Sequence, residues 1–272
     1  MVRNKKSGFG PGFLVTAAFI GPGTVTSCSL AGAGFGYSLI YALVFATITT
    51  LFLQEMTGRL SLGSGMDLGQ TLRSYSRNRV SQIIIIVITL SAITFGCAAY
   101  EAGNIIGGSL GLEALTPVSQ KIWVVLISLA AFLILNRKRY KIIEKFLMLL
   151  VFLMSLSFIT TFIIIGPDFR SLLQGFVPSI PKNSGYLILA LIGTTVVPYN
   201  LFLHSSAVKE KWNSKTDIKF IRKDLLVSIG LGGIISITIV VTAAGAFFGS
   251  TVQIQKGIDL SLIHISEPTR PY

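Results

Sequence analysis

Long apolar runs, separated by shorter polar segments, follow one another along the chain. They lie at about residues 10–30, 37–56, 82–108, 119–136, 146–166, 185–207 and 225–248. Each run is close to or above the roughly 20 residues that a helix needs to cross the hydrocarbon core of a bilayer. The pattern therefore predicts an all-helical, multi-pass membrane protein with about seven spans.

The composition supports this prediction. Hydrophobic residues make up 51% of the 272-residue chain and charged residues only 12%, about half the charge of an average soluble domain. The first apolar run is long and has no small-residue cleavage site, so we do not expect a cleaved signal peptide. The sequence has no phosphate-binding loop, nucleophile–base pair or zinc-ligand spacing, which argues against an enzyme and against a bound cofactor.

Basic residues are concentrated in alternate polar segments. The segments at 1–9, 57–81, 137–145 and 208–224 hold 18 of the 23 Lys and Arg residues. Cytoplasmic loops of membrane proteins carry such an excess, so the net charge of +12 reflects membrane topology rather than nucleic-acid binding. The pattern predicts a cytoplasmic N-terminus at residues 1–8, with the lipid bilayer and no nucleic acid as partner. The membrane that we expect is a bacterial inner membrane.

Helix-breaking residues interrupt the first and the sixth run. Gly21-Pro22-Gly23 lies in the middle of the first run and Val197-Pro198-Tyr199 in the middle of the sixth. Proline removes a backbone donor, and unwound backbone is tolerated at membrane depth only where it is buried in protein or lines a cavity. One break is explained by a simple kink, but two breaks five spans apart lie in helices of opposite direction. This pattern is typical of inverted-repeat transporters, whose substrate site lies between two discontinuous helices.

Four stretches of the sequence indicate a family. They are Gly10–Val15 (GPGFLV), Gly21–Thr24 (GPGT), Ala31–Tyr37 (AGAGFGY) and Gly193–Ser206 (GTTVVPYNLFLHSS). Over about residues 9 to 250 the chain resembles the Nramp divalent metal transporters. The resemblance implies a LeuT-like fold of two inverted five-helix repeats, which moves a divalent metal cation such as Mg²⁺ or Mn²⁺ by alternating access. The first repeat is then expected at 9–166, and the first two helices of the second repeat at 185–250.

The end of the chain departs from the family. Residues 261–272 (SLIHISEPTRPY) do not resemble an Nramp eighth helix and are similar to a translated sequencing adapter. We therefore expect an artefactual tail, with His264 no site residue, and a transporter fold truncated near Leu260 after about seven spans. A chain cut within its second repeat is not expected to transport by itself.

The residues at the two breaks also differ from the family. The first-helix motif Asp-Pro-Gly-Asn has Gly21 and Thr24 at its first and last positions, and the sixth-helix motif Met-Pro-His-Asn has Val197 and Tyr199 at its first and third. The resemblance still implies a metal site here, formed by Gly21, Thr24, Thr194, Val197 and Asn200. Without the carboxylate and the thioether, its donors are neutral oxygens, which favour a hard, hydrated cation over a soft one. The residues expected to break the helices are Pro22, Gly23, Pro198 and Tyr199.

Three further polar residues lie within the predicted spans. Glu101 and Asn104 match two acids of the third family helix, and His204 matches a histidine of the sixth. The resemblance implies that these residues form a route for protons or charge. The alternatives are that Glu101 pairs with a neighbour such as Tyr100, and that His204 is an ordinary buried polar residue. Because Gly21 carries no carboxylate, both proton symport and uncoupled flux are open.

Two other functions are also open. A LeuT-like carrier of an organic solute or of a monovalent ion would bind its substrate without any effect of divalent ions. A membrane protein with a sensing or structural role would show saturable binding without transport.

Overall fold

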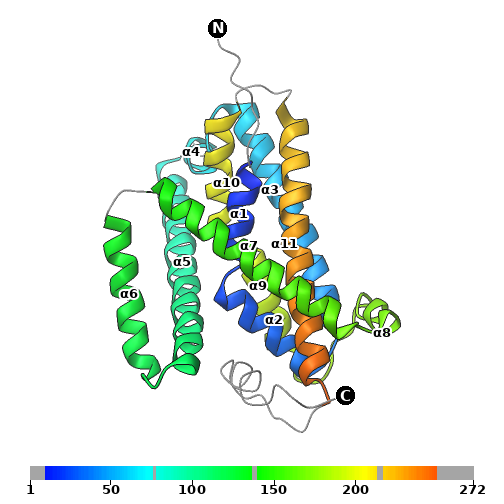
Figure 1. Ribbon diagram of the computed structural model, residues 1–272. Coiled ribbons are helices and arrows are strands. Elements are labelled where there is room, and N and C mark those ends of the chain that lie inside the picture. The colour runs from blue at the N-terminus through cyan, green and yellow to red at the C-terminus, as the bar shows by residue number, and fades with distance from the viewer. Residues whose placement is uncertain (1–9, 76–77, 137–139, 213–216, 250–272) are drawn as a thin grey trace, which may run out of the picture. The chain divides into compact units, whose positions relative to one another are not determined.

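The computed structural model describes residues 10–75, 78–136, 140–212 and 217–249. These residues form helices joined by loops and turns, with no strand among them (Figure 1). The helices are α1 (Pro11–Phe19), α2 (Pro22–Phe35), α3 (Ile40–Ser64), α4 (Leu68–Tyr75), α5 (Arg79–Leu115), α6 (Gln120–Asn136), α7 (Tyr140–Ile165), α8 (Phe169–Gln174), α9 (Gly185–Thr195), α10 (Pro198–Lys211) and α11 (Ile218–Phe247). The expected cytoplasmic segment 1–8 and the expected tail 261–272 with His264 lie outside the described residues.

Every predicted span contains a helix, which confirms the all-helical prediction. Within the described part of the chain, four helices are long and apolar enough to cross a membrane, or five if α1 and α2 together form one bent span. The two remaining runs form shorter apolar helices, at Gln120–Ile134 and Leu149–Ile165. The short helices α4 and α8 were not predicted, because neither contains a long apolar run.

Both predicted breaks are present, and the backbone at the two breaks has the same local arrangement. The residue before each second half-helix, Gly21 or Val197, is extended (φ −132° and ψ −179°; φ −101° and ψ 121°) and is followed by a proline at the first helical position. Proline is tolerated there because its missing N–H would have no intrahelical acceptor. The chain is bent at the first break, whereas Gly185–Lys211 qualifies as one apolar span despite its break.

The chain divides into two compact units. In its described part, the first unit comprises residues 10–19, 47–97 and 196–232, and the second comprises residues 20–46, 98–195 and 233–249. The helices α3, α5 and α11 contribute residues to both units.

In the first unit, α10 packs against both α1 and α4. Its apolar core consists of Val208, Trp212, Ile221, Leu225 and Ile229. Part of α3 packs closely here as well, since a Cβ added to Gly58 would lie 3.1 Å from Ile221 and 3.3 Å from His204. The helices α3, α10 and α11 therefore pack against one another in this unit.

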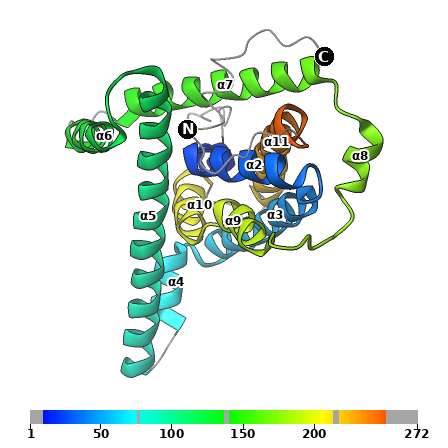
Figure 2. The ribbon, with the colours of Figure 1, turned by 90° about the horizontal axis from the view of Figure 1, so that it is seen from below.

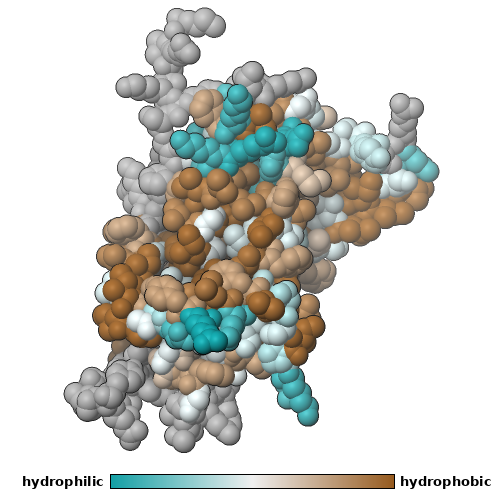
Figure 3. Space-filling view, turned by 90° about the vertical axis from the view of Figure 1, so that its right-hand side faces the viewer, coloured by the Kyte–Doolittle hydropathy of each residue, from teal (hydrophilic) through white to brown (hydrophobic). Residues whose placement is uncertain are grey.

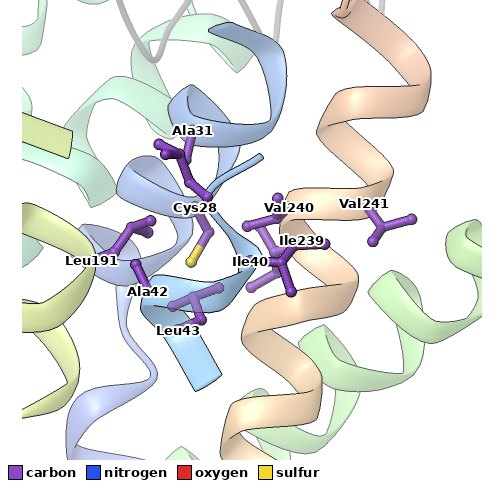
Figure 4. Packing of buried hydrophobic residues seen from close by; sticks show 10 residues of the cluster. Cys28, Ala31, Ile40, Ala42, Leu43, Leu191, Ile239, Val240 and Val241 are labelled. Atoms are coloured by element: carbon purple, nitrogen blue, oxygen red, sulfur yellow. The ribbon is translucent and has the colours of Figure 1, made fainter. Parts of the chain in front are cut away.

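In the second unit, α2 packs against α9, as the view in Figure 2 shows. The core side chains come from α2, the start of α3, α9 and the last part of α11. Most of them gather around Cys28 and Leu43, whereas Val241 points to the other side of α11 (Figure 4). A Cβ on Gly32 would overlap the carbonyl of Val240. Only glycine therefore allows α2 to approach α11 this closely within the unit.

Large apolar side chains also cover much of the surface. Hydrophobic residues predominate over the face that Figure 3 draws. The most apolar stretch of α5 contains no buried residue. Its exposed members include Ile83, Ile84, Val87, Ile88, Leu90 and Phe95. Exposed apolar area on this scale indicates contact with lipid or with further protein.

Candidate functional site

Thr24 lies in the first turn of α2, directly after the first break. Its side chain is fully buried, and its Oγ1 lies 3.4 Å from the hydroxyl of Tyr100 on α5. The carbonyl of Gly21 already accepts the N–H of Val25 at 3.0 Å, although a carbonyl has a second lone pair for another partner. The first break thus presents a buried hydroxyl and a backbone oxygen, both uncharged.

One face of α5 packs against the start of α2 in the second unit. Asn104 and Gly107 lie three residues apart and therefore on the same face of the helix. A Cβ added to Gly21 would lie 2.7 Å from Asn104 Oδ1, and one added to Gly107 would lie 2.7 Å from Pro22 Cβ. Tyr100, four residues before Asn104, shares this face and contacts Thr24.

Glu101 is exposed, and it accepts a hydrogen bond of 3.1 Å from Asn104 Nδ2. Tyr100, the other suggested partner of Glu101, has its hydroxyl 3.4 Å from Thr24 Oγ1. The structure therefore joins two of the three residues expected on the charge route, within a single turn of α5.

The end of α9 carries two adjacent threonines before the second break. The hydroxyls of Thr194 and Thr195 both donate to the carbonyl of Leu191, at 3.2 and 3.1 Å. Such back-bonding uses the hydroxyl proton within the helix. The oxygen lone pairs of Thr194 are not consumed by this bond and can still accept a hydrogen bond or bind a cation.

Asn200 lies in the first turn of α10, in the first unit, and Val197 is the residue just before this helix. Val197 is 5% exposed and Asn200 fully buried. Neither Oδ1 nor Nδ2 of Asn200 has a hydrogen-bond partner within the described segments. A buried amide without partners costs roughly 1–3 kcal/mol, which marks Asn200 as a side chain suited to bind something that the chain does not itself supply.

His204 is fully buried one turn further along α10. Its Nδ1 lies 3.4 Å from Thr57 Oγ1, and Thr57 donates to the carbonyl of Gln54 at 2.9 Å. One turn on, Ser61 and Ser205 form a second contact between α3 and α10, at 2.9 Å. Gln54, Thr57 and Ser61 were missed by the sequence analysis, although their spacing of three and four residues places them on one helix face.

The four expected break residues lie in the first turns of the second half-helices. Pro22 and Gly23 belong to α2, and Pro198 and Tyr199 to α10. The breaks themselves fall just before them, at Ile20–Gly21 and Val196–Val197. Of the expected ligands, Gly21, Thr24 and Thr194 belong to the second unit, and Val197 and Asn200 to the first.

The donor set determines which cation these residues suit. Throughout the described part of the chain, no three His, Cys, Asp or Glu residues lie close enough to hold a metal. The available atoms at the breaks are hydroxyl, amide and carbonyl oxygens. Such oxygens suit a hard cation that keeps part of its hydration shell.

A cavity of about 570 Å³ lies elsewhere in the second unit. It is lined by the turn between α2 and α3, by α8 with the loop that follows it, and by Ala244 and Phe248. None of the expected site residues lines it, so it is not a candidate for the predicted site.

A family model, related sequences and solved structures all match this chain. A family model described as "Natural resistance-associated macrophage protein-like" matches residues 12–263. The divalent metal cation transporter MntH of Staphylococcus aureus strains JH9 and Newman is 30% identical over 257 residues, which are 90% of this chain and 56% of the relative. A crystal structure of the Eremococcus coleocola manganese transporter, bound to an aromatic bis-isothiourea compound, aligns with a TM-score of 0.69 at 25% identity. That alignment covers 87% of this chain and 51% of the transporter. The chain thus spans about half the length of the relatives that it matches.

Proposed function

Since this chain belongs to the Nramp family, we propose that it functions within a secondary transporter that moves a divalent metal cation across a membrane. The observation that carries the proposal is the pair of helices interrupted before Pro22 and Pro198, each with buried neutral oxygens in the adjoining turn. The names of the relatives support the class of substrate, since MntH is a divalent metal cation transporter and the Eremococcus protein a manganese transporter.

The proposed ligands are neutral oxygens. They are the Thr24 hydroxyl, backbone carbonyls near Gly21 and Thr194, and the Asn200 amide, and Val197 is the apolar residue expected at the same site. A site without a carboxylate or a thioether binds a fully dehydrated soft ion weakly. It is better suited to a hard ion that keeps several waters. We therefore propose Mg²⁺ as a substrate alongside Mn²⁺.

Transport would proceed by alternating access around this site, with residues 9–166 as the first repeat and residues 185–250 as the first two helices of the second. The charged and polar residues Glu101, Asn104 and His204 would influence proton movement. Because Gly21 supplies no carboxylate to exchange a proton, we propose that the cation gradient drives flux without obligatory proton symport.

The proposed setting is a bacterial inner membrane with the N-terminus in the cytoplasm. The long apolar helices and their exposed hydrophobic side chains support integral membrane insertion. The concentration of Lys and Arg in alternate loops supports the orientation.

Uptake by liposomes that contain the full-length transporter, with a complete second repeat, tests this function. Fluorescent indicators of Mg²⁺ and Mn²⁺ inside the vesicles would report entry, with empty liposomes as control. Saturable uptake of either ion, reduced when the other is added, supports a divalent cation carrier. If a folded, inserted protein takes up neither ion, the site serves another solute, such as a monovalent ion or an organic molecule.

A further inference from the structure

The amide of Asn104 has a defined orientation. Its Nδ2 donates to Glu101 Oε2 at 3.1 Å, and the amide oxygen is the other substituent on the same carbon. That oxygen, Oδ1, is the Asn104 atom nearest to the side-chain position of Gly21, just before α2. Glu101 acts here as a positioning residue for the Asn104 oxygen.

The space at Gly21 is fitted to this oxygen. A Cβ on Gly21 would lie 2.7 Å from Asn104 Oδ1, a separation that real Cβ atoms essentially never show. A Cβ on Gly23 would lie at 3.9 Å, an ordinary contact. Any side chain at position 21 would displace Asn104, so the oxygen takes the place where a side chain of the first broken helix would begin.

The same oxygen is buried and unused. Asn104 Oδ1 accepts no hydrogen bond from the residues that the structure describes, and Gly21 gives α2 no side-chain cap. A buried carbonyl oxygen normally has a partner. Its position beside the first break, close to the turn that carries Thr24, gives it a natural partner in a bound cation.

We propose that Asn104 Oδ1 is a direct ligand of the transported cation, in place of a side chain from position 21. The inference rests on the proposed function, and adds to the site an oxygen from α5, outside the two broken helices. An amide ligand at this place is neutral, whereas a carboxylate ligand would be negatively charged. The pair Gly21–Asn104 therefore determines specificity for hard cations.

Calorimetric titration of the intact, detergent-purified protein with Mn²⁺ and Mg²⁺ tests the proposal. The variants are Asn104→Ala, Gly21→Ala, their combination and Asn104→Asp. Gly103→Ala is the matched control, because nothing lies within 4 Å of a Cβ at that position. Thermal unfolding of each variant reports separately on folding.

We expect both single alanine variants to weaken Mn²⁺ and Mg²⁺ binding by about tenfold or more. The double variant should be no weaker than the weaker-binding single variant, because both substitutions remove the same oxygen from the site. Asn104→Asp, which keeps the shape of the side chain, should bind Mn²⁺ at least as tightly as the wild type. Gly103→Ala should bind both ions like the wild type.

The outcomes separate this inference from the proposed function. If the wild type binds no divalent cation, both are overturned. If the wild type binds and Asn104→Ala retains the same affinity, the inference alone is overturned. A lower unfolding temperature with unchanged affinity would likewise overturn it, and would assign Asn104 to stabilising the start of α2.

Discussion

The backbone N–H of Gly12 donates a hydrogen bond of 2.7 Å to Oδ2 of Asp224. Through it, α11 satisfies a donor at the start of α1 that has no partner within its own helix. A Cβ on Gly10 would overlap the same carboxylate, and a Cβ on Gly12 would overlap Ser228 Oγ. The Gly-Pro-Gly sequence at 10–12 is thus explained by the carboxylate that it accommodates.

Removal of this contact should destabilise the first unit. Hydrogen bonds to charged groups are worth about 1.5–3 kcal/mol, so Asp224→Ala should lower the free energy of unfolding by that order. Gly12→Ala should do the same by steric overlap. Thermal unfolding in detergent would measure both variants. The matched control is Gly63→Ala, which meets nothing within 4 Å; an equal loss in the control would contradict the account.

The ion pair between Glu55 and Arg222 should matter much less. Both Nε and Nη2 of Arg222 lie 2.7 Å from Glu55 Oε1, but the arginine side chain is 56% exposed. Partly solvated pairs typically contribute under about 1 kcal/mol. Glu55→Gln should therefore change the unfolding temperature far less than Asp224→Ala, and the difference should shrink at high salt. A loss as large as that of Asp224→Ala would show that the pair is not solvated.

The first turn of α8 should become less stable in acid, because an aspartate side chain caps it. Asp168 caps α8 by accepting from Ser171 Oγ at 2.6 Å and from the N–H groups of Ser171 and Arg170 at 3.1 and 3.2 Å. The hydrogen bond from the Ser171 hydroxyl is the largest cause that lowers the pKa of this carboxyl, followed by the two backbone bonds.

The direction of the pH effect follows from this lowered pKa. The cap stabilises α8 fully above the ordinary carboxyl pKa of 3.8, and the stabilisation is lost as the pH falls through the lower folded value. Amide hydrogen exchange at Ser171 and Leu172, corrected for intrinsic rates, should accelerate over that range. Asp168→Ala should exchange fast at every pH; protection that persists in this variant would contradict the cap.

Proton coupling is testable through His204. An imposed inward proton gradient should leave divalent cation uptake unchanged, because Gly21 offers no carboxylate and His204 Nδ1 is engaged near Thr57. A pH-sensitive dye inside the liposomes should show no acidification during uptake. His204→Gln, which keeps a polar group in the buried site, should transport at a similar rate. Acidification that depends on His204 would instead establish proton symport.

The sequence alone predicted the helices of the long apolar runs and both breaks, because apolar runs mark the helices and proline and glycine act locally on the backbone. Pro22 and Pro198 each start a half-helix for reasons visible within four residues. The partners of the breaks were not predictable in the same way. Asn104 reaches Gly21 from 83 positions away, and Asp224 reaches Gly12 from 212 positions away.

The residues of the Gly12–Asp224 contact are unusual enough to be noticed in the amino-acid sequence. An uncommon carboxylate at the start of the last apolar run, and glycines on either side of Pro11, were both present in the sequence. Only tertiary packing pairs them, because glycine indicates a close approach without naming the partner. The ligand set of the site depends in the same way on which oxygens converge, and not on any single motif.

The central claim, a cation site of neutral oxygens at the first break, is tested most directly by two threonines on α2. Thr24 is fully buried beside the break, whereas Thr26 donates back to the carbonyl of Pro22 at 2.9 Å on an exposed face. Initial rates of Mn²⁺ and Mg²⁺ uptake should be measured for Thr24→Ala and Thr26→Ala in the intact protein. The account predicts about a tenfold or greater loss for Thr24→Ala and near wild-type uptake for Thr26→Ala. Equal rates for the two variants would contradict it.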